Sequence, residues 1–330
     1  MISLAHGIGG VRDLPVPESF FFTTAAIVLV VSFIVLGALW RRPLLESHAG
    51  GRSLPREFQA VLLSRALRIA VQALSATLFL LVLTASLFGS TVELENLAPT
   101  FVYVVFWLGL PLLSVTLGDV WRLLSPWRAI ADATVWVLEL GGREARPVLG
   151  GAERLGRYPA AAALFAFVAL ELAHPRPAYP RTLAIAIALY SYWALAGMAV
   201  YGRDAWTRHG EGFAVAFSLL ARMAPFTVRE GRIVVRWPLT GLGGAERVPG
   251  TLVLVAVMLG STSFDGFSRT SVWQDLIADV RARLVDASLR VSDLAVTAVN
   301  LVGLAAFVAA VTLTYLAAVS VARRLVRSRR

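Results

Sequence analysis

The sequence predicts an all-α protein, a polytopic bundle of about seven transmembrane helices that forms one integral membrane domain over residues 1–330. Hydrophobic residues make up 57% of the chain, and its mean hydropathy of +0.70 lies far above that of a soluble domain. The apolar residues fall into seven stretches: Phe20–Trp40, Ile69–Gly89, Phe101–Leu117, Tyr158–Leu172, Leu183–Tyr201, Thr251–Phe264 and Ala295–Ala322. A helix needs ~20 apolar residues to cross the ~30 Å hydrocarbon core of a bilayer, so the third, fourth and sixth stretches are short.

The distribution of arginine predicts the orientation of these spans. All 31 basic residues are Arg. Loops 41–68, 118–157, 202–250 and 323–330 hold 24 of them, and the alternate set, 1–19, 90–100, 173–182 and 265–294, holds seven. Basic loops stay in the cytoplasm, so we expect a bacterial inner-membrane protein with its N-terminus outside and its C-terminus in the cytoplasm. The arginines are scattered beside the spans, which indicates the lipid bilayer as a partner and disfavours nucleic acid.

The segment before the first span is expected to remain as an outer N-terminal segment, residues 1–19. It has no basic region at its start and no small-residue cleavage site before Phe20, so it does not resemble a signal peptide. The chain contains no Cys, which excludes disulfides and thiolate metal sites. It also contains no G-x-S-x-G, H-E-x-x-H or P-loop motif.

Two cytoplasmic loops, 118–157 and 202–250, are predicted to be structured. Asp119–Leu140 carries Trp and apolar residues at helical spacing, with Pro126 breaking it into two pieces. Gly202–Phe226 has a similar apolar stripe with charged residues opposite. We expect both to be amphipathic helices in the membrane interface. An eighth span within Asp119–Leu140 is the alternative, but its uncharged part is far too short.

Two smaller elements complete the predicted fold. Thr227–Trp237 alternates apolar and polar residues around Glu230-Gly231, which predicts a small cytoplasmic β-hairpin whose arginines lie near anionic lipid headgroups. In the outer interfacial loop 265–294, apolar residues of Asp275–Arg290 recur in rough helical register, and we expect a helix there that caps the outer face.

The central parts of the predicted spans carry no charged residue and no His, which disfavours charge-driven transport through the midplane. Gln72 and Asn300 are the strongest polar side chains at depth, and we expect both to form hydrogen bonds between helices. Pro111 is expected to kink the third span.

The short fourth and sixth spans point to a polar site. Counting ~1.5 Å per residue from the inner boundary places Glu171 and His174 below the outer surface. Asp265 falls at a similar depth in the sixth span, where Ser261–Ser263 and Gly266 suit a helix that opens into a cavity. We therefore expect these three side chains to converge in one outward-facing cavity, with residues 6–13 folded over it as a lid.

A single divalent metal ion is one interpretation of this site. Glu171 and His174 are spaced i, i+3 and share a helix face. His6, His174, Glu171 and Asp265, with Asp13 nearby, could make a two-His, carboxylate site. The simpler alternative is that Glu171 and His174 end a helix and pair with nearby arginines: Arg176, Arg181 or Arg269.

Four segments carry a resemblance to a family: Leu4–Pro17, Gly118–Asp132, Glu211–Phe226 and Ser261–Ser268. Over nearly its whole length, the chain resembles a family of bacterial multi-pass membrane proteins, some of which are named fenitrothion hydrolase. The resemblance implies hydrolysis of an organophosphorus triester, a lipophilic small-molecule substrate that could enter from the membrane. It implies no particular catalytic residue. The alternative is a non-enzymatic membrane component, such as a transport or respiratory or metal-assembly factor, that uses the same site.

Overall fold

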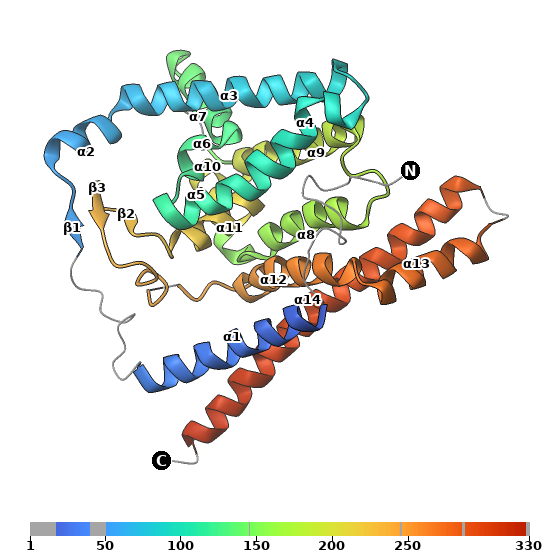
Figure 1. Cartoon of the computed structure of the whole chain (residues 1–330). Helices are drawn as coiled ribbons and strands as arrows, with labels where there is room; N and C mark the ends of the chain where they lie inside the picture. Colours follow the sequence, from blue (N-terminus) through green and yellow to red (C-terminus); the bar gives the residue numbers. More distant parts are fainter. Residues whose placement is uncertain (1–17, 40–50, 145, 245, 286–287, 328–330) are drawn as a thin grey trace.

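The computed structural model is mostly helical, with one small three-stranded sheet at one end of the helical bundle (Figure 1). It describes residues 18–39, 51–144, 146–244, 246–285 and 288–327. We call the end that carries the sheet the sheet end, and the opposite end, where the connection of residues 174–179 lies, the far end.

Five segments of the described chain are long and apolar enough to cross a membrane. They are Arg56–Phe88, Leu97–Leu117, Pro180–Tyr201, Thr251–Ser268 and Leu289–Leu325. Each corresponds to a predicted span. The other two predicted spans are the helices α1 (Glu18–Leu39) and α8 (Tyr158–Ala173). With 16 residues, α8 is shorter than a bilayer-crossing helix, so length and composition do not confirm the count of seven.

The long helices alternate in direction between the two ends. In Figure 1, α3 (Arg65–Phe88), α8 and α12 (Thr251–Ser268) run from the sheet end towards the far end. The third span and α9 (Pro180–Tyr201) run back, as does α14 (Leu289–Arg327). The connections that were predicted to share a side therefore lie at the same end. The short helix α2 (Arg56–Leu62) precedes α3, and a 3₁₀ turn, Glu93–Glu95, follows it.

Close helix packing is built on small residues. α12 packs against both α14 and α8. A Cβ at Gly260 would come within 2.8 Å of Val308 Cα, so only glycine lets the backbones of α12 and α14 approach this closely. Small residues at such contacts are typical of helix packing in membranes.

The third span is irregular. It consists of α4 (Leu97–Thr100), a π-helical segment (Phe101–Gly109) and α5 (Leu110–Leu117). Pro111 is the second residue of α5. It has no N–H to donate, and its ring crowds the carbonyl four residues earlier. The predicted disturbance at Pro111 therefore takes the form of a widened helix on its N-terminal side, a geometry often found at functional sites.

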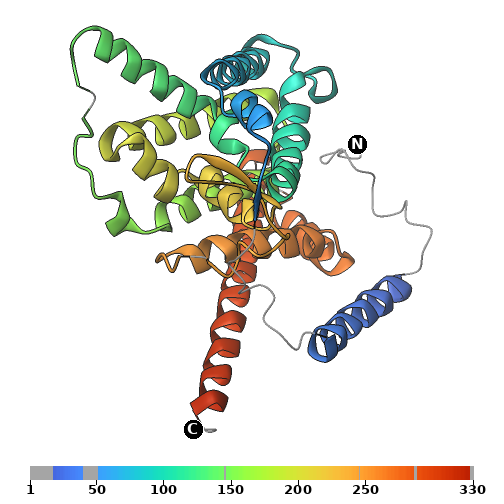
Figure 2. The ribbon, with the colours of Figure 1, turned by 90° about the vertical axis from the view of Figure 1, so that its left-hand side faces the viewer.

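The predicted break at Pro126 is confirmed. α6 (Trp121–Leu124) ends at Ser125, whose hydroxyl accepts from Arg128 N at 3.3 Å and caps α7 (Pro126–Leu140). Figure 1 shows α3 lengthwise and α7 nearly end-on, whereas Figure 2 shows the reverse. α7 therefore runs across the direction of the long helices, as an interfacial helix would.

The prediction of one amphipathic helix over Gly202–Phe226 is wrong. The structure has two helices there, α10 (Arg203–His209) and α11 (Gly212–Ala221). α11 has no polar face, because each residue from Gly212 to Phe217 is buried. The charged residues that suggested a polar face lie in α10 or after α11. α11 packs against α5 and α8 inside the bundle and not along its surface.

The β-hairpin is confirmed as β2 (Phe226–Arg229) and β3 (Arg232–Val235). Glu230 and Gly231 join them with φ values of 49° and 72°, as a tight two-residue hairpin turn requires. β1 (Arg52–Ser53) adds to the other edge of β3, giving the order β1-β3-β2. The predicted helix over Asp275–Arg290 is α13, which spans Ser271–Arg283 and packs along the start of α14.

Candidate functional site

Two of the predicted site residues come together at the far end. α8 and α12 lie side by side, and Glu171 and Asp265 occupy the last turns of these two helices. The charge of Asp265 acts on the Glu171 carboxyl, and so does the charge of Arg269. We call Glu171, Asp265, Arg269 and Trp107 the far-end cluster.

The far-end cluster contains charges of both signs. Arg269 Nη2 donates to Asp265 Oδ1 at 3.2 Å, an i, i+4 ion pair on α12. Both side chains are partly exposed, at 36% and 39%. Glu171 is half-buried and forms no ion pair of its own among the described residues. The cluster therefore offers a carboxylate that is not ion-paired beside a paired carboxylate and a guanidinium.

The widened third span supplies the aromatic side of this cluster. The indole of Trp107 lies near the Glu171 carboxyl. Four residues earlier, the Tyr103 hydroxyl donates to the Pro177 carbonyl at 2.9 Å and ties the third span to the α8–α9 connection. Both aromatic residues lie in the π-helical segment, so the irregular helix places Trp107 near Glu171 and Tyr103 against the α8–α9 connection.

His174 is placed as a helix-end residue. It is the C-cap of α8, and its Nδ1 accepts from Arg176 N at 3.2 Å. This bond occupies one of its two ring nitrogens. It comes from the backbone of Arg176, whereas the simpler alternative predicted pairing with an arginine side chain, and no described ion pair contains His174. His6 and Asp13 lie outside the described residues. Within the described part of the chain, no group of three or more His, Cys, Asp or Glu side chains could hold a metal ion.

Sequence reasoning missed a second polar centre, around Glu211. This residue is 0% exposed and is the N-cap of α11. Its carboxylate accepts from Phe213 N at 3.1 Å, Ala214 N at 2.8 Å and Trp121 Nε1 at 3.1 Å. The Tyr190 hydroxyl donates a fourth, short hydrogen bond. The two backbone N–H groups and the indole can only donate, so this geometry suits an ionised carboxylate.

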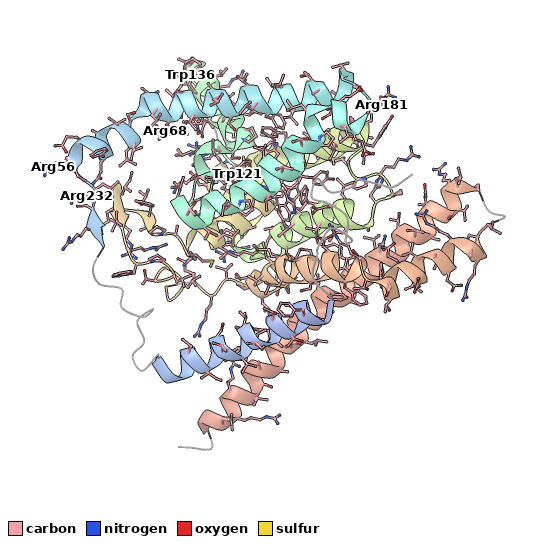
Figure 3. The ribbon with its side chains drawn as sticks, viewed as in Figure 1. Arg56, Arg68, Trp121, Trp136, Arg181 and Arg232 are labelled. Atoms are coloured by element: carbon pink, nitrogen blue, oxygen red, sulfur yellow. The ribbon has the colours of Figure 1, made fainter. Side chains whose placement is uncertain are left out.

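Aromatic rings enclose the Glu211 carboxylate. Trp121 lies among the helices in Figure 3, whereas Trp136 of α7 lies at the edge of the bundle. The centroids of Phe213 and Tyr190 are 4.7 Å apart, and those of Phe213 and Phe106 are 4.6 Å apart. The Trp127 indole, 4.8 Å from Tyr190, donates to Ser191 Oγ at 2.8 Å. These rings keep water from the carboxylate, so its four donors must come from the protein.

A third polar cluster joins α3, α7 and α10. Asp132 accepts from Gln72 Nε2 at 2.9 Å and pairs with Arg203. Asp204 is bound by Arg203 at 2.9 Å and by Arg128 at 2.7 Å. Burial acts to raise the pKa of Asp204, but the hydrogen bonds from the two arginines outweigh it and lower the value to about 2.

The hydrogen bonds between helices that were predicted for Gln72 and Asn300 are both confirmed. Gln72 on α3 binds Asp132 on α7, and Asn300 Oδ1 on α14 accepts from the indole of Trp273 on α13 at 3.0 Å. Each of these two side chains therefore has a partner from another helix.

One sequence signal could have revealed Glu211. It directly precedes Gly212–Ala221, ten residues without a charge, and an acid before such a run suits the N-cap of a buried helix. Comparison with protein-family models, with curated proteins and with solved structures finds no match.

Proposed function

We propose that the chain is an integral protein of the bacterial inner membrane with seven spans, in which α1 and α8 complete the five longer ones. α8 measures ~24 Å, at ~1.5 Å per residue, so its last turn would lie below the outer surface. The split of 24 against seven arginines supports an N-terminus outside, a C-terminus in the cytoplasm and a far end that faces outward.

The far-end cluster is the proposed binding site for a lipophilic small molecule. One observation carries this proposal: Glu171 and Asp265 come from different helices and approach closely enough for their charges to act on one another. Two carboxylates in a partly buried setting stabilise a cation or a shared proton between them. The apolar helices around the cluster would admit a lipophilic molecule from the outer leaflet.

Hydrolysis of an organophosphorus triester is the activity that the family resemblance implies, and the cluster has groups suited to it. Glu171 would act as general base and take a proton from water as the water oxygen bonds to phosphorus. The bond from phosphorus to the leaving oxygen would then break. Arg269 would stabilise the charge that develops on the phosphoryl oxygen, and Trp107 would orient Glu171.

A metal ion would need more donors than this part of the chain provides. Asp265 is paired with Arg269, and one nitrogen of His174 is engaged with the backbone. A divalent ion held by His6, His174, Glu171 and Asp265 would therefore depend on the segment before α1. Metal analysis of the purified protein, as wild type and as His174→Ala, tests this part of the proposal.

The decisive experiment measures binding and turnover together. Purified full-length protein in nanodiscs is given a fluorogenic aryl phosphotriester, and binding and product release are followed for the wild type and for Glu171→Gln. We expect the variant to lose turnover by about 100-fold, as expected when a general base is removed. Asp275→Asn, an exposed carboxylate on α13, is the matched control and should keep wild-type activity.

The second candidate function is a non-enzymatic membrane component that binds its ligand at the same cluster. The observation that favours it is the ion pair between Asp265 and Arg269. Because of this pair, Glu171 is the one carboxylate of the cluster that is left for acid–base catalysis. Binding that is weakened by Glu171→Gln, without turnover in the wild type, would establish this function. Failure of the wild type to bind or turn over any lipophilic ester would reject the site.

A further inference from the structure

At the sheet end, Arg157 is an arginine without an ion-pair partner among the described residues. Its residue is only 8% exposed, and its Nη1 donates to Thr251 Oγ1 at 3.0 Å. Its Nε is buried and has no hydrogen-bond partner, and Arg157 forms no ion pair with any described acid. A buried guanidinium N–H without a partner is costly, so this side chain is suited to a further acceptor.

Two helix N-termini meet at this arginine. Arg157 is the N-cap of α8, and Gly250 is the N-cap of α12. Arg157 N donates to Pro249 O at 2.7 Å, and a Cβ at Gly250 would lie 2.6 Å from Tyr158 N. Gly250 also has a φ of 84°, which favours glycine. The first turns of the two helices are therefore held side by side.

Neither helix start is neutralised. No side chain caps α8 or α12, and no acidic residue lies in the first turn of either helix. The first N–H groups of a helix lack partners within it, and its N-terminus carries a partial positive charge. An arginine at the N-cap adds to this positive charge. Here Pro159 has no N–H and Thr251 N donates to the Val248 carbonyl at 3.2 Å, so the other first-turn N–H groups are the ones that remain for a ligand.

A second arginine increases the positive charge further. The charge of Arg222 acts on Arg157, and Arg222 Nη1 donates to the Gly244 carbonyl at 3.2 Å. Glu246 is the acid that acts on Arg157, but no ion pair joins the two. Burial, and next the charge of Arg222, lower the pKa of Arg157. His209, on which Arg157 also acts, has a buried Nδ1 without a partner.

We propose that a phosphate group binds at Arg157, between the N-termini of α8 and α12, with Arg222 as its second cation. Phosphates bind at helix N-termini because the free N–H groups and the helix dipole favour an anion. The planar guanidinium of Arg matches phosphate oxygens with two parallel N–H groups. The phosphate belongs either to the headgroup of an anionic lipid or to a free phosphate compound. Other arginines at the sheet end, Arg56, Arg68 and Arg232, would draw either ligand towards this end (Figure 3).

The test uses the full-length protein in two settings. In detergent, inorganic phosphate is titrated and the melting temperature and binding heat are recorded. In nanodiscs, phosphatidylglycerol is compared with phosphatidylcholine. We expect saturable stabilisation in at least one setting. Arg157→Gln and Arg222→Gln should each weaken binding by about tenfold or more, as for the loss of one charge-assisted hydrogen bond. Arg154→Gln removes the same charge from an exposed position nearby and should change affinity less than about twofold.

The outcomes separate the sources of the phosphate. A response to phosphatidylglycerol alone identifies a lipid headgroup, and a response to inorganic phosphate identifies a free phosphate compound. Arg222 is half-buried, so Arg222→Gln tests the proposal even if Arg157→Gln does not fold. The proposal is overturned if the wild type responds to neither ligand, or if Arg222→Gln binds as tightly as Arg154→Gln. The far-end cluster lies at the other end of the bundle, so its failure would leave this result unaffected.

Discussion

Glu211 and Arg236 bind the two opposite ends of one buried helix, α11. The Glu211 carboxylate accepts the N–H groups of Phe213 and Ala214 at the start. The Arg236 guanidinium donates to the carbonyls at the end: Ala221 at 3.3 Å, Arg222 at 2.9 Å and Ala224 at 3.0 Å. An anion at the N-terminus and a cation at the C-terminus complement the helix dipole. Together, the two side chains form hydrogen bonds with backbone groups at the ends of α11 that have no partner within this helix.

Replacing Glu211 with Gln should destabilise the protein by about 2–3 kcal/mol, since a buried amide presents an NH₂ group to donors that need an acceptor. Thermal unfolding in detergent, followed by Trp fluorescence, measures this change. Glu139→Gln, an exposed acid at the end of α7, serves as control and should alter stability by less than about 0.5 kcal/mol. Equal melting temperatures for the two variants would show that the Glu211 network is not stabilising.

Replacing Arg236 with Met should also destabilise the protein, because three carbonyls at the end of α11 each lose a charged donor, and in the described chain only that of Ala221 keeps a backbone donor, the Ala224 N–H. We expect a loss of about 1.5–3 kcal/mol, as for hydrogen bonds to a charged group. Arg229→Met removes an exposed arginine from the same sheet and is the control. Protease cleavage of the 222–250 segment should accelerate in Arg236→Met, and unchanged cleavage would argue against the cap.

The pH dependence of stability should report Asp204. Its pKa is lowered to about 2, so its ion pairs stabilise the fold above about pH 4 and lose this effect as the pH falls towards 2. The side chain is 52% exposed, so we expect at most about 1 kcal/mol. The melting temperatures of wild type and Asp204→Asn should therefore differ at pH 6, and the difference should shrink below about pH 4 and vanish below about pH 2. A difference that stays constant over this range would exclude the linkage.

Reporter fusions test the orientation of the chain. Fusions at Gly150 and Arg330 should report the cytoplasm, and a fusion at Thr91 should report the outside. The reason is that the loops at the sheet end carry most of the arginines. A periplasmic signal at Arg330 would contradict both the seven-span topology and the outward-facing position of the far-end cluster.

The positions of the long helices could be predicted from apolar composition, but not all of their ends: α14 covers Leu289–Arg327, whereas the predicted span was Ala295–Ala322. The predicted span Phe101–Leu117 ends where α5 ends, and the predicted span Thr251–Phe264 begins where α12 begins. The hairpin followed from the turn chemistry of Glu230-Gly231. The third strand of the sheet, β1, could not be predicted, because a strand of two residues is too short to show an alternation of apolar and polar residues.

The nature of α11 could not be predicted from its stripe of apolar residues, since charged residues on both sides resembled a polar face. Only the three-dimensional contacts show that Arg203 and Asp204 belong to a separate helix and bind α7. For the far-end cluster, counting depth along the short spans placed Glu171 and Asp265 at a similar level, and in the structure the charge of Asp265 acts on the Glu171 carboxyl. The convergence of both with His174 in one cavity, covered by residues 6–13, stays a prediction. Counting depth could not predict Trp107, whose position depends on the widened turn before Pro111.

Trp107, in that widened turn, also connects the far-end cluster to the Glu211 carboxylate through a series of packed aromatic rings. The rings of Trp107 and Phe213 have centroids 6.2 Å apart, and both pack on Phe167, at 4.8 Å and 5.1 Å. Phe213 in turn donates its N–H to Glu211. Closely packed rings transmit displacement because they barely compress. A molecule that displaces Trp107 at the far end would therefore also displace Phe213 at the start of α11. If Phe213 cannot move, Trp107 stays in place and the molecule cannot bind there.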